Sequence, residues 1–205
     1  MKARSRLPDE TMANSDLQEL EELFWPRGWR QDVWMVIDGS RDPGIYPTLI
    51  NSYLDYSCLY RGDIAAALQR AAPYLVQLQQ DGPYSRELLG RAWGAGWGIV
   101  LRCDLGMQRV LRHLRKFLLV RDPRGKQLLF RYYAPHVLRT YLPTCNAAEI
   151  AEFYGPIEAF YVEDENPSVA WEFRRDGPAL VQNRHDLRTH AAPPPGDLRK
   201  PAGDF

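Results

Sequence analysis

The sequence has few cysteines, no excess of either charge and no long apolar run. Its three cysteines, Cys58, Cys103 and Cys145, are widely spaced and predict neither a disulfide framework nor a zinc site. Lys plus Arg and Asp plus Glu each number 26, and this zero formal net charge argues against a nucleic-acid binder. No apolar run approaches the ~20 residues of a membrane-spanning helix, and no signal-peptide core is visible near residue 1. We therefore expect a cytoplasmic protein with reduced thiols that binds neither nucleic acid nor membrane.

Sequence motifs for nucleotide binding and for common catalytic chemistry are also missing. Neither a Gly-x-Ser-x-Gly elbow nor a Walker-type Gly-Lys-Ser occurs. The glycine-rich bend at 90–98 lies between a predicted helix and a predicted strand, which is the reverse of the order that presents a helix N-terminus to phosphate. We interpret it as a bend that ends a helix and lets Trp93 and Trp97 pack closely. No histidine has a partner at metal-binding spacing, so the sequence predicts no enzyme, no metal and no cofactor.

Apolar periodicity predicts strands that alternate with helices. Residues 17–24 have apolar side chains at helical spacing, and the run 33–38 is short enough for a buried strand. Two alternating segments, 157–164 and 169–176, predict a hairpin, and the periodicity fades after Gly177. Further strands are predicted at 56–60, 74–78, 97–103 and 126–133, with helices between them, including 105–118.

These elements predict an α/β fold: a single domain with a mixed β-sheet flanked by helices, a closing β-hairpin and an irregular C-terminal tail. By residue number, the predicted parts are an N-terminal helical segment (1–30), the α/β domain (31–177) and an extended, partly disordered tail (178–205). An Asn146 to Glu149 capping box is predicted at the start of a helix near 147–154.

Several polar groups are candidates for function, each with a structural alternative. Arg41 and Asp38 lie at the end of the first predicted strand, where open α/β sheets bind ligands, but Asp38 is also suited to capping the following turn. Cys145 near a helix start is a weak candidate for a thiol dyad with His136. The acidic run 163–165 is interpreted as a solvated hairpin tip. The helix 105–118 has a basic face that suits solvent, an acidic partner or nucleic acid: Arg109, Arg112, Arg115 and Lys116. The zero net charge favours the acidic partner over nucleic acid.

Eight segments, in order, resemble a known family. The most specific are FRYYAPHVLRTYLPTC (130–145) and FYGPI (153–157). Together they resemble the type VI secretion adaptor family called the Tap or TEC chaperones, first catalogued as a domain of unknown function, from about Val33 to Gly177. The segments are VIDGSRDPGIYPTL (36–49), YSCLYRG (56–62), APYLVQL (72–78), WGAGWGIVLRCD (93–104), LRHLRKFLLVRD (111–122), LLFRYYAPHVLRTYLPTC (128–145), FYGPIEAFYVED (153–164) and WEFRRDG (171–177).

The resemblance implies a non-catalytic adaptor chaperone. Family members bind a cognate secreted effector encoded nearby and promote its loading onto the C-terminal part of a VgrG spike protein. They are generally not delivered with the effector. Ala134 stands where the family often has an acidic residue, so no polar role is carried over to it.

A protein-binding face is the hypothesis for the polar members of the 131–141 segment. Arg and Tyr are favoured at the centres of protein interfaces. The alternative is that the aromatic and leucine side chains of this segment are core and the charged ones only solvate it. The predicted protein-binding residues are Arg131, Tyr133, His136, Arg139, Asp38 and Arg41. The alternative function is a small-molecule or nucleotide-binding α/β domain that uses the sheet edge near Asp38.

Overall fold

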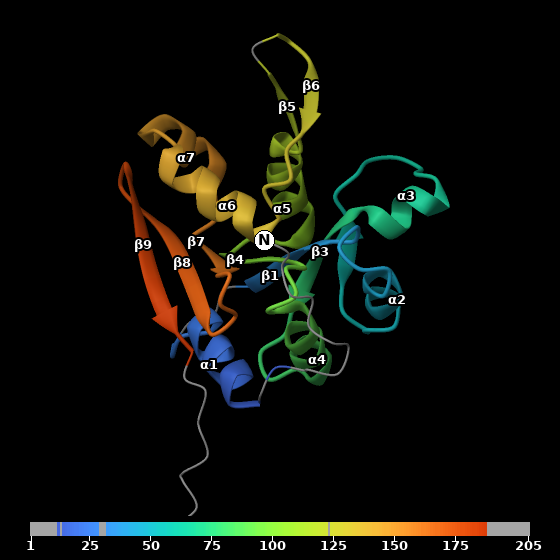
Figure 1. Ribbon diagram of the computed structural model, residues 1–205, viewed down its shortest axis with the longest axis vertical. Helices are drawn as coiled ribbons and strands as arrows, with labels where there is room; N and C mark the ends of the chain where they lie inside the picture. The colour runs from blue at the N-terminus through green and yellow to red at the C-terminus, as the bar shows by residue number, and fades with distance from the viewer. Residues whose placement is uncertain (1–11, 13, 29–31, 123, 188–205) are drawn as a thin grey trace, which may run out of the picture.

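The apolar run near residue 33 becomes a central strand of a seven-stranded sheet (Figure 1). A computed structural model describes residues 12, 14–28, 32–122 and 124–187. The sheet has the order β2-β3-β1-β4-β7-β8-β9, and a separate two-stranded sheet pairs β5 with β6. The strands are β1 (Asp32–Asp38), β2 (Tyr56–Cys58), β3 (Pro73–Leu78), β4 (Gly98–Cys103), β5 (Leu119–Arg121), β6 (Gln127–Leu129), β7 (Ala159–Glu163), β8 (Val169–Asp176) and β9 (Ala179–Asp186).

Helices cover both faces of this sheet. Two short 3-10 turns, Arg115–Phe117 and Leu142–Thr144, extend α5 and α6. The α-helices are α1 (Asn14–Phe24), α2 (Ile45–Ile50), α3 (Ala66–Ala71), α4 (Pro83–Ala92), α5 (Met107–Leu114), α6 (Pro135–Tyr141) and α7 (Ala147–Tyr154). The α/β class is thereby confirmed. Both hydrogen bonds of the predicted capping box of α7 are present, one to the Asn146 side chain and one to the Glu149 side chain.

Neighbouring strands run antiparallel throughout the described sheet, whereas the sequence predicts a mixed sheet. Alternating helices and strands are typical of parallel neighbours. Here the connections through α2 and through α4 do join strands of the same direction, but another strand lies between the two, and the connection through α3 joins the antiparallel neighbours β2 and β3. β1 and β2 run in the same direction with β3 between them, and β3 and β4 do so with β1 between them. The sequence shows which strands alternate with helices, but not which strand is inserted between two others.

Burial on both faces explains why β1 reads as a continuous apolar run. Val33, Met35 and Ile37 contribute to one core cluster, while Trp34 and Val36 contribute to the other. Residues of α1, α2 and α4 complete the first cluster, and those of α5, α6 and α7 complete the second. Because successive side chains of a strand point to opposite faces, a sheet between two helical layers needs apolar residues at every position.

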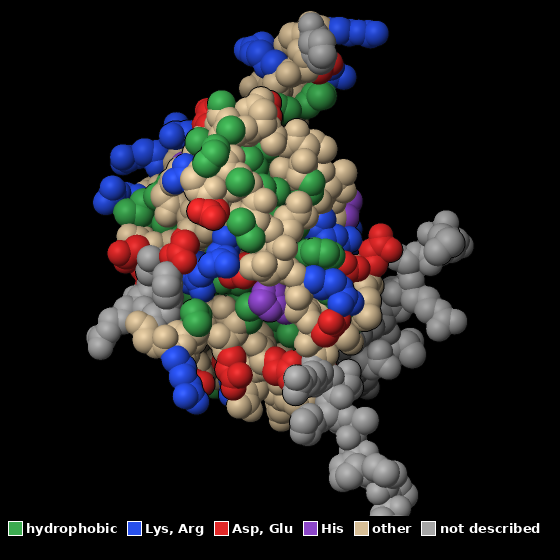
Figure 2. Space-filling model, turned by 90° about the vertical axis from the view of Figure 1, so that its left-hand side faces the viewer, with side chains coloured by type: hydrophobic (Ala, Val, Ile, Leu, Met, Phe, Trp, Pro, Cys, Tyr) green, Lys and Arg blue, Asp and Glu red, His purple; other side chains and the backbone are tan. Residues whose placement is uncertain are grey.

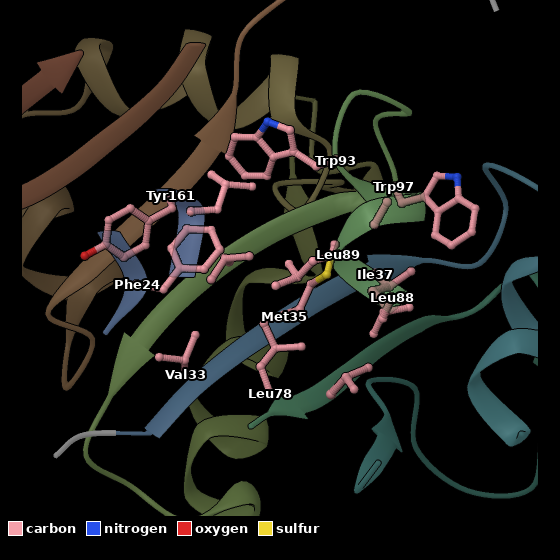
Figure 3. Packing of buried hydrophobic residues seen from close by; sticks show 14 of the residues in the cluster. Phe24, Val33, Met35, Ile37, Leu78, Leu88, Leu89, Trp93, Trp97 and Tyr161 are labelled. Atoms are coloured by element: carbon pink, nitrogen blue, oxygen red, sulfur yellow. The ribbon is translucent and has the colours of Figure 1, made fainter. Parts of the chain in front are cut away.

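The N-terminal helix α1 belongs to this core. Figure 3 shows Phe24 of α1 beside Tyr161 of β7, and their ring centroids are 5.1 Å apart. Leu20 and Phe24 are fully buried. In the same view the side chains of β1 face Leu88 and Leu89 of α4. The predicted segment 1–30 therefore includes a helix that is part of the domain, while residues 1–11 lie outside the described residues.

The chain after residue 178 is not an irregular tail throughout. β9 pairs with β8 from Ala179 opposite Asp176 to Asp186 opposite Val169, so the closing hairpin is extended by a third strand. β9 was hard to predict because its residues alternate between exposed and half-buried, as expected of an edge strand with few apolar residues. The rest of the predicted tail, 188–205, lies outside the described residues.

In the part of the chain that the structure describes, no helix has the length and apolarity needed to cross a membrane. The same residues include no group of three or more His, Cys, Asp or Glu side chains placed to hold a metal ion.

Candidate functional site

Charged residues from distant segments meet at one end of the sheet. Asp38 closes β1 and Glu163 closes β7, and the glycine-rich bend before β4 lies between them because β4 pairs with both strands. Arginines from the loop after β1 and from the 131–139 segment surround these two carboxylates. We call this set, Asp38, Arg41, Arg131, Arg139 and Glu163, the sheet-end cluster.

Asp38 is a buried acceptor whose two oxygens are both engaged. Its side chain is 1% exposed. Oδ1 accepts hydrogen bonds from the Ser40 backbone N–H at 3.1 Å and from the Ser40 hydroxyl at 2.7 Å. Oδ2 pairs with Nη2 of Arg131 at 2.5 Å. The structural interpretation of Asp38 as a turn cap is therefore confirmed, and the ion pair with Arg131 offsets the cost of burying its charge.

Arg131 and Tyr133 differ in exposure, although both were predicted to be exposed. The Arg131 side chain is 44% exposed, whereas Tyr133 is 1% exposed and hydrogen bonded to Tyr60 and Arg131. Burial raises the pKa of Tyr133. The prediction for Tyr133 is wrong because β6 ends at Leu129 and the chain turns before α6, so Tyr132 and Tyr133 both face the core instead of alternating.

Glu163 lies in a cradle of backbone N–H groups. Its carboxylate accepts hydrogen bonds from the Gly94 and Gly96 N–H groups, where both glycines have positive φ. Burial raises the pKa of Glu163 to about 7, although the two N–H groups and the nearby Arg139 and Arg41 favour the charged form. The interpretation of residue 163 as part of a solvated tip is wrong, because Glu163 is the buried last residue of β7 and the turn follows it.

The glycine-rich bend thus combines the predicted structural role with an unpredicted one. It ends α4 and buries Trp93 and Trp97, as expected. A side chain at Gly98 would place its Cβ 1.9 Å from the Val36 carbonyl oxygen, so only glycine fits where β4 approaches β1. The bend also binds an anion through its backbone, but the anion is the internal Glu163 carboxylate.

Arg139 and His136 lie on α6 with different surroundings. Arg139 is half-buried, and its guanidinium donates to the backbone oxygen of Glu163. The His136 side chain is exposed. The basic face of α5 is also divided, because Arg115 donates to the carbonyl oxygens of Leu59 and Cys58 at 2.8 and 2.7 Å, while the other three basic residues of the face are exposed.

The thiols have the properties of structural cysteines. The Cys145 thiol donates to the Tyr141 carbonyl oxygen at 3.5 Å, and burial raises its pKa. Burial also raises the pKa of Cys58 and, to about 11, that of Cys103. A raised pKa lowers the thiolate fraction at neutral pH, which disfavours the thiol dyad of Cys145 with His136.

The described surface includes two hollows beside α2, α3 and α4. One of about 340 Å³ lies between α2 and α4, and one of about 360 Å³ lies beside β2 and α3. Neither hollow is lined by Asp38 or Arg41. Neither of these two hollows therefore lies at the predicted ligand site near Asp38, whose carboxylate is engaged by Ser40 and Arg131.

The structure brings together five of the six predicted protein-binding residues, and it adds one that the sequence did not suggest. Asp38, Arg41, Arg131 and Arg139 belong to the sheet-end cluster, with Tyr133 beneath Arg131. Glu163 was missed because its partner Gly94 is 69 residues away. Alternating glycines are a signal for an anion cradle, but nothing in the sequence pairs that cradle with a particular carboxylate.

Comparison with family models gives one match. Residues 33–152 match the family described as "Domain of unknown function (DUF4123)". The chain belongs to the DUF4123 family. No curated protein and no solved structure matches it. The DUF4123 match begins at β1 and ends within α7, so it contains the four other members of the sheet-end cluster but not Glu163.

Proposed function

We propose that this DUF4123 protein is a cytoplasmic adaptor that binds a cognate type VI secretion effector and promotes its loading onto the VgrG spike. The observation that carries the proposal is the ordered set of eight segments that resemble the Tap or TEC adaptors. Six of these segments lie within the residues that match DUF4123. The proposal includes no catalytic step and no cofactor.

The exposed side of the sheet-end cluster supports a protein-binding role. Its two carboxylates, Asp38 and Glu163, are buried, while Arg41 and Arg131 are exposed. The exposed charged groups of the cluster itself are therefore guanidinium groups, which bind carboxylates in two-pronged geometry. We propose that this surface contacts an acidic group of the effector or the spike.

The experiment that tests the function is co-expression with the effector and the VgrG protein encoded beside this chain. Tagged pull-down and size-exclusion chromatography are expected to give a stable complex with the effector, which VgrG joins. If the chain stays alone while both partners are soluble and folded, the adaptor role is wrong. A thermal-shift screen with nucleotides and phosphates would then test the ligand-binding alternative near Asp38.

Alanine variants separate binding from stability within the predicted face. Arg41→Ala and His136→Ala remove exposed side chains, so each should change the free energy of unfolding by no more than about 0.5 kcal/mol. At a binding hot spot either change should weaken the complex by about 2 kcal/mol. Arg131→Ala should lower the free energy of unfolding by about 1–3 kcal/mol, because it leaves the Asp38 carboxylate buried without its cation.

Denaturant unfolding and titration of the purified complex measure both quantities. Arg70→Ala on α3 is the matched control for loss of an exposed arginine elsewhere. Equal affinity of all these variants for effector and spike would contradict the binding face, while leaving the adaptor role intact.

A further inference from the structure

The β5–β6 hairpin projects from the body of the protein as an arm. Figure 1 shows it extending beyond α5, away from the seven-stranded sheet. Its ladder pairs Leu119 with Leu129 and Arg121 with Gln127, and the Phe130 N–H donates to the Leu118 carbonyl oxygen at 2.8 Å at its base. An isolated two-stranded hairpin has marginal stability in water, and a third strand or a covering surface adds to it.

Four large aliphatic side chains of the arm are exposed to solvent. Leu119 is 55% exposed, Val120 39%, Leu128 41% and Leu129 44%. Leu119 lies opposite Leu129 and Val120 opposite Leu128, so the two successive pairs present apolar groups on both faces of the ribbon. Contiguous apolar groups on a projecting element are typical of a contact surface.

The tip of the arm is basic. Arg121, Arg124 and Lys126 are exposed there. The one described acid of the turn, Asp122, accepts hydrogen bonds from the backbone N–H groups of Arg124 and Lys126 at 2.9 Å each, so its carboxylate shapes the turn. Figure 2 shows Lys and Arg side chains gathered around the end of the projecting arm.

The order of these groups along the arm indicates the chemistry of the partner. A membrane-inserting hairpin needs apolar residues at its tip, but here the cationic residues are at the tip and the apolar pairs are nearer the body. Nucleic acid would engage the cations but leave four aliphatic side chains uncovered. A polypeptide with acidic and apolar side chains complements both parts, and in extended form it can also pair with the open edge of β5 or β6.

We propose that the β5–β6 hairpin is a docking arm for an extended segment of a partner protein in which acidic residues lie next to apolar ones. As a strand along one edge of the hairpin, the segment places alternate side chains beside the Leu119–Leu129 pair on one face and the Val120–Leu128 pair on the other, and its carboxylates meet the cations of the tip. This inference rests on the proposed adaptor function, because it assigns a surface to one of the adaptor's two partners.

Charge reversal tests the contribution of the tip. In the co-expression experiment, the triple variant Arg121→Glu, Arg124→Glu and Lys126→Glu is expected to weaken binding of the effector or of VgrG by roughly tenfold or more. The matched control, Arg27→Glu, Arg70→Glu and Arg175→Glu, makes the same change in net charge at exposed positions of other elements and should bind as the unaltered chain does. Thermal unfolding should show that both variants are folded.

Photo-crosslinking locates the occupant directly. With p-benzoylphenylalanine in place of Leu128, irradiation of the complex should join the arm to the effector or to VgrG, within a segment that mass spectrometry finds acidic and apolar. The same group in place of Leu68, which is 46% exposed on α3, is the control and should give no such product.

The outcomes distinguish the arm from the adaptor role. A complex that forms equally with the triple variant, without crosslinking from position 128, overturns the docking arm and leaves the adaptor role standing. Failure of the unaltered chain to bind either soluble partner overturns both. A crosslink only between two copies of this chain, or binding only to anionic lipid vesicles or to duplex DNA, also overturns the arm as a site for an acidic partner segment.

Discussion

The Glu163 carboxyl group is held where burial opposes its charge and the Gly94 and Gly96 N–H groups favour it. Burial prevails, because the pKa rises from 4.5 to about 7. A folded-state pKa above the unfolded value means that the folded protein binds the proton more tightly. The contribution of Glu163 to stability is therefore greatest below about pH 4.5, and it is lost as the pH rises through about 7.

Glu163→Gln should remove this pH dependence. A pKa shift from 4.5 to about 7 corresponds to a loss of about 3 kcal/mol between the two limits. Urea unfolding at pH 5.0 and pH 7.5 should show a smaller difference in unfolding free energy for Glu163→Gln than for the unaltered chain. Glu165→Gln at the exposed turn is the control. If Glu163→Gln and the unaltered chain show the same difference between the two pH values, the Glu163 carboxyl group of the unaltered chain is ionised in the folded protein over this range.

At the scale of elements, β9 completes the closing part of the sheet. Glu172 of β8 is 8% exposed and accepts a hydrogen bond from the Asn183 side chain of β9 at 2.9 Å. Leu187, directly after β9, is 5% exposed and belongs to the core cluster that includes α1. β9 therefore covers the edge of β8, and its Asn183 side chain provides a hydrogen-bond donor for the buried Glu172 carboxylate.

Shortening the chain tests the role of β9. A chain that ends at Gly177 should be less stable than one that ends at Leu187 by at least about 2 kcal/mol, because Glu172 loses a hydrogen-bond donor and β8 becomes an open edge. Denaturant unfolding measures the difference, and light scattering should show more aggregation of the shorter chain. Equal unfolding midpoints would instead support the irregular tail that the sequence predicts from residue 178.

At the scale of the whole molecule, the DUF4123 match covers less than the folded unit. Residues 33–152 lack α1, which packs against one face of the sheet, and β7, which pairs with β4. Two residues of β7, Phe160 and Val162, are fully buried in the second core cluster. The two faces of the sheet are therefore completed by segments on both sides of the matched region.

A fragment of residues 33–152 is expected not to fold cooperatively, whereas residues 12–187 should. Removing α1 and β7–β9 exposes apolar surface on both faces of the remaining strands, and each large core side chain left uncovered costs about 1.5–3 kcal/mol. Circular dichroism melting and dispersion of amide proton shifts compare the two fragments. A sharp thermal transition in the 33–152 fragment would show that the matched region is a domain by itself.

The local features of the sequence predicted local structure well. Apolar runs and helical spacing placed β1, β3, β4, α1 and the hairpin of β7 with β8, because side-chain periodicity depends on the geometry of one segment. The capping box of α7 was predictable because its donors and acceptors lie within four residues. Asp38 and Arg41 were predicted as candidate binding residues because they follow the first strand. Arg131 and Arg139 were predicted because arginine is favoured in protein interfaces and both lie in the 131–141 segment.

Only the tertiary structure decided how these pieces meet. β1 lies between β3 and β4, and β3 lies between β1 and β2, so strands of the same direction are not neighbours there, and this order depends on contacts between distant segments that no local pattern records. The same holds for Glu163, whose burial depends on a glycine bend 69 residues away. Tyr133 turned inward because β6 ended early. The sequence by itself determined most of the helices and strands, though not β9, and it showed which family the chain resembles. Long-range packing decided which charges are buried, and so which part of the predicted face remains exposed for a partner.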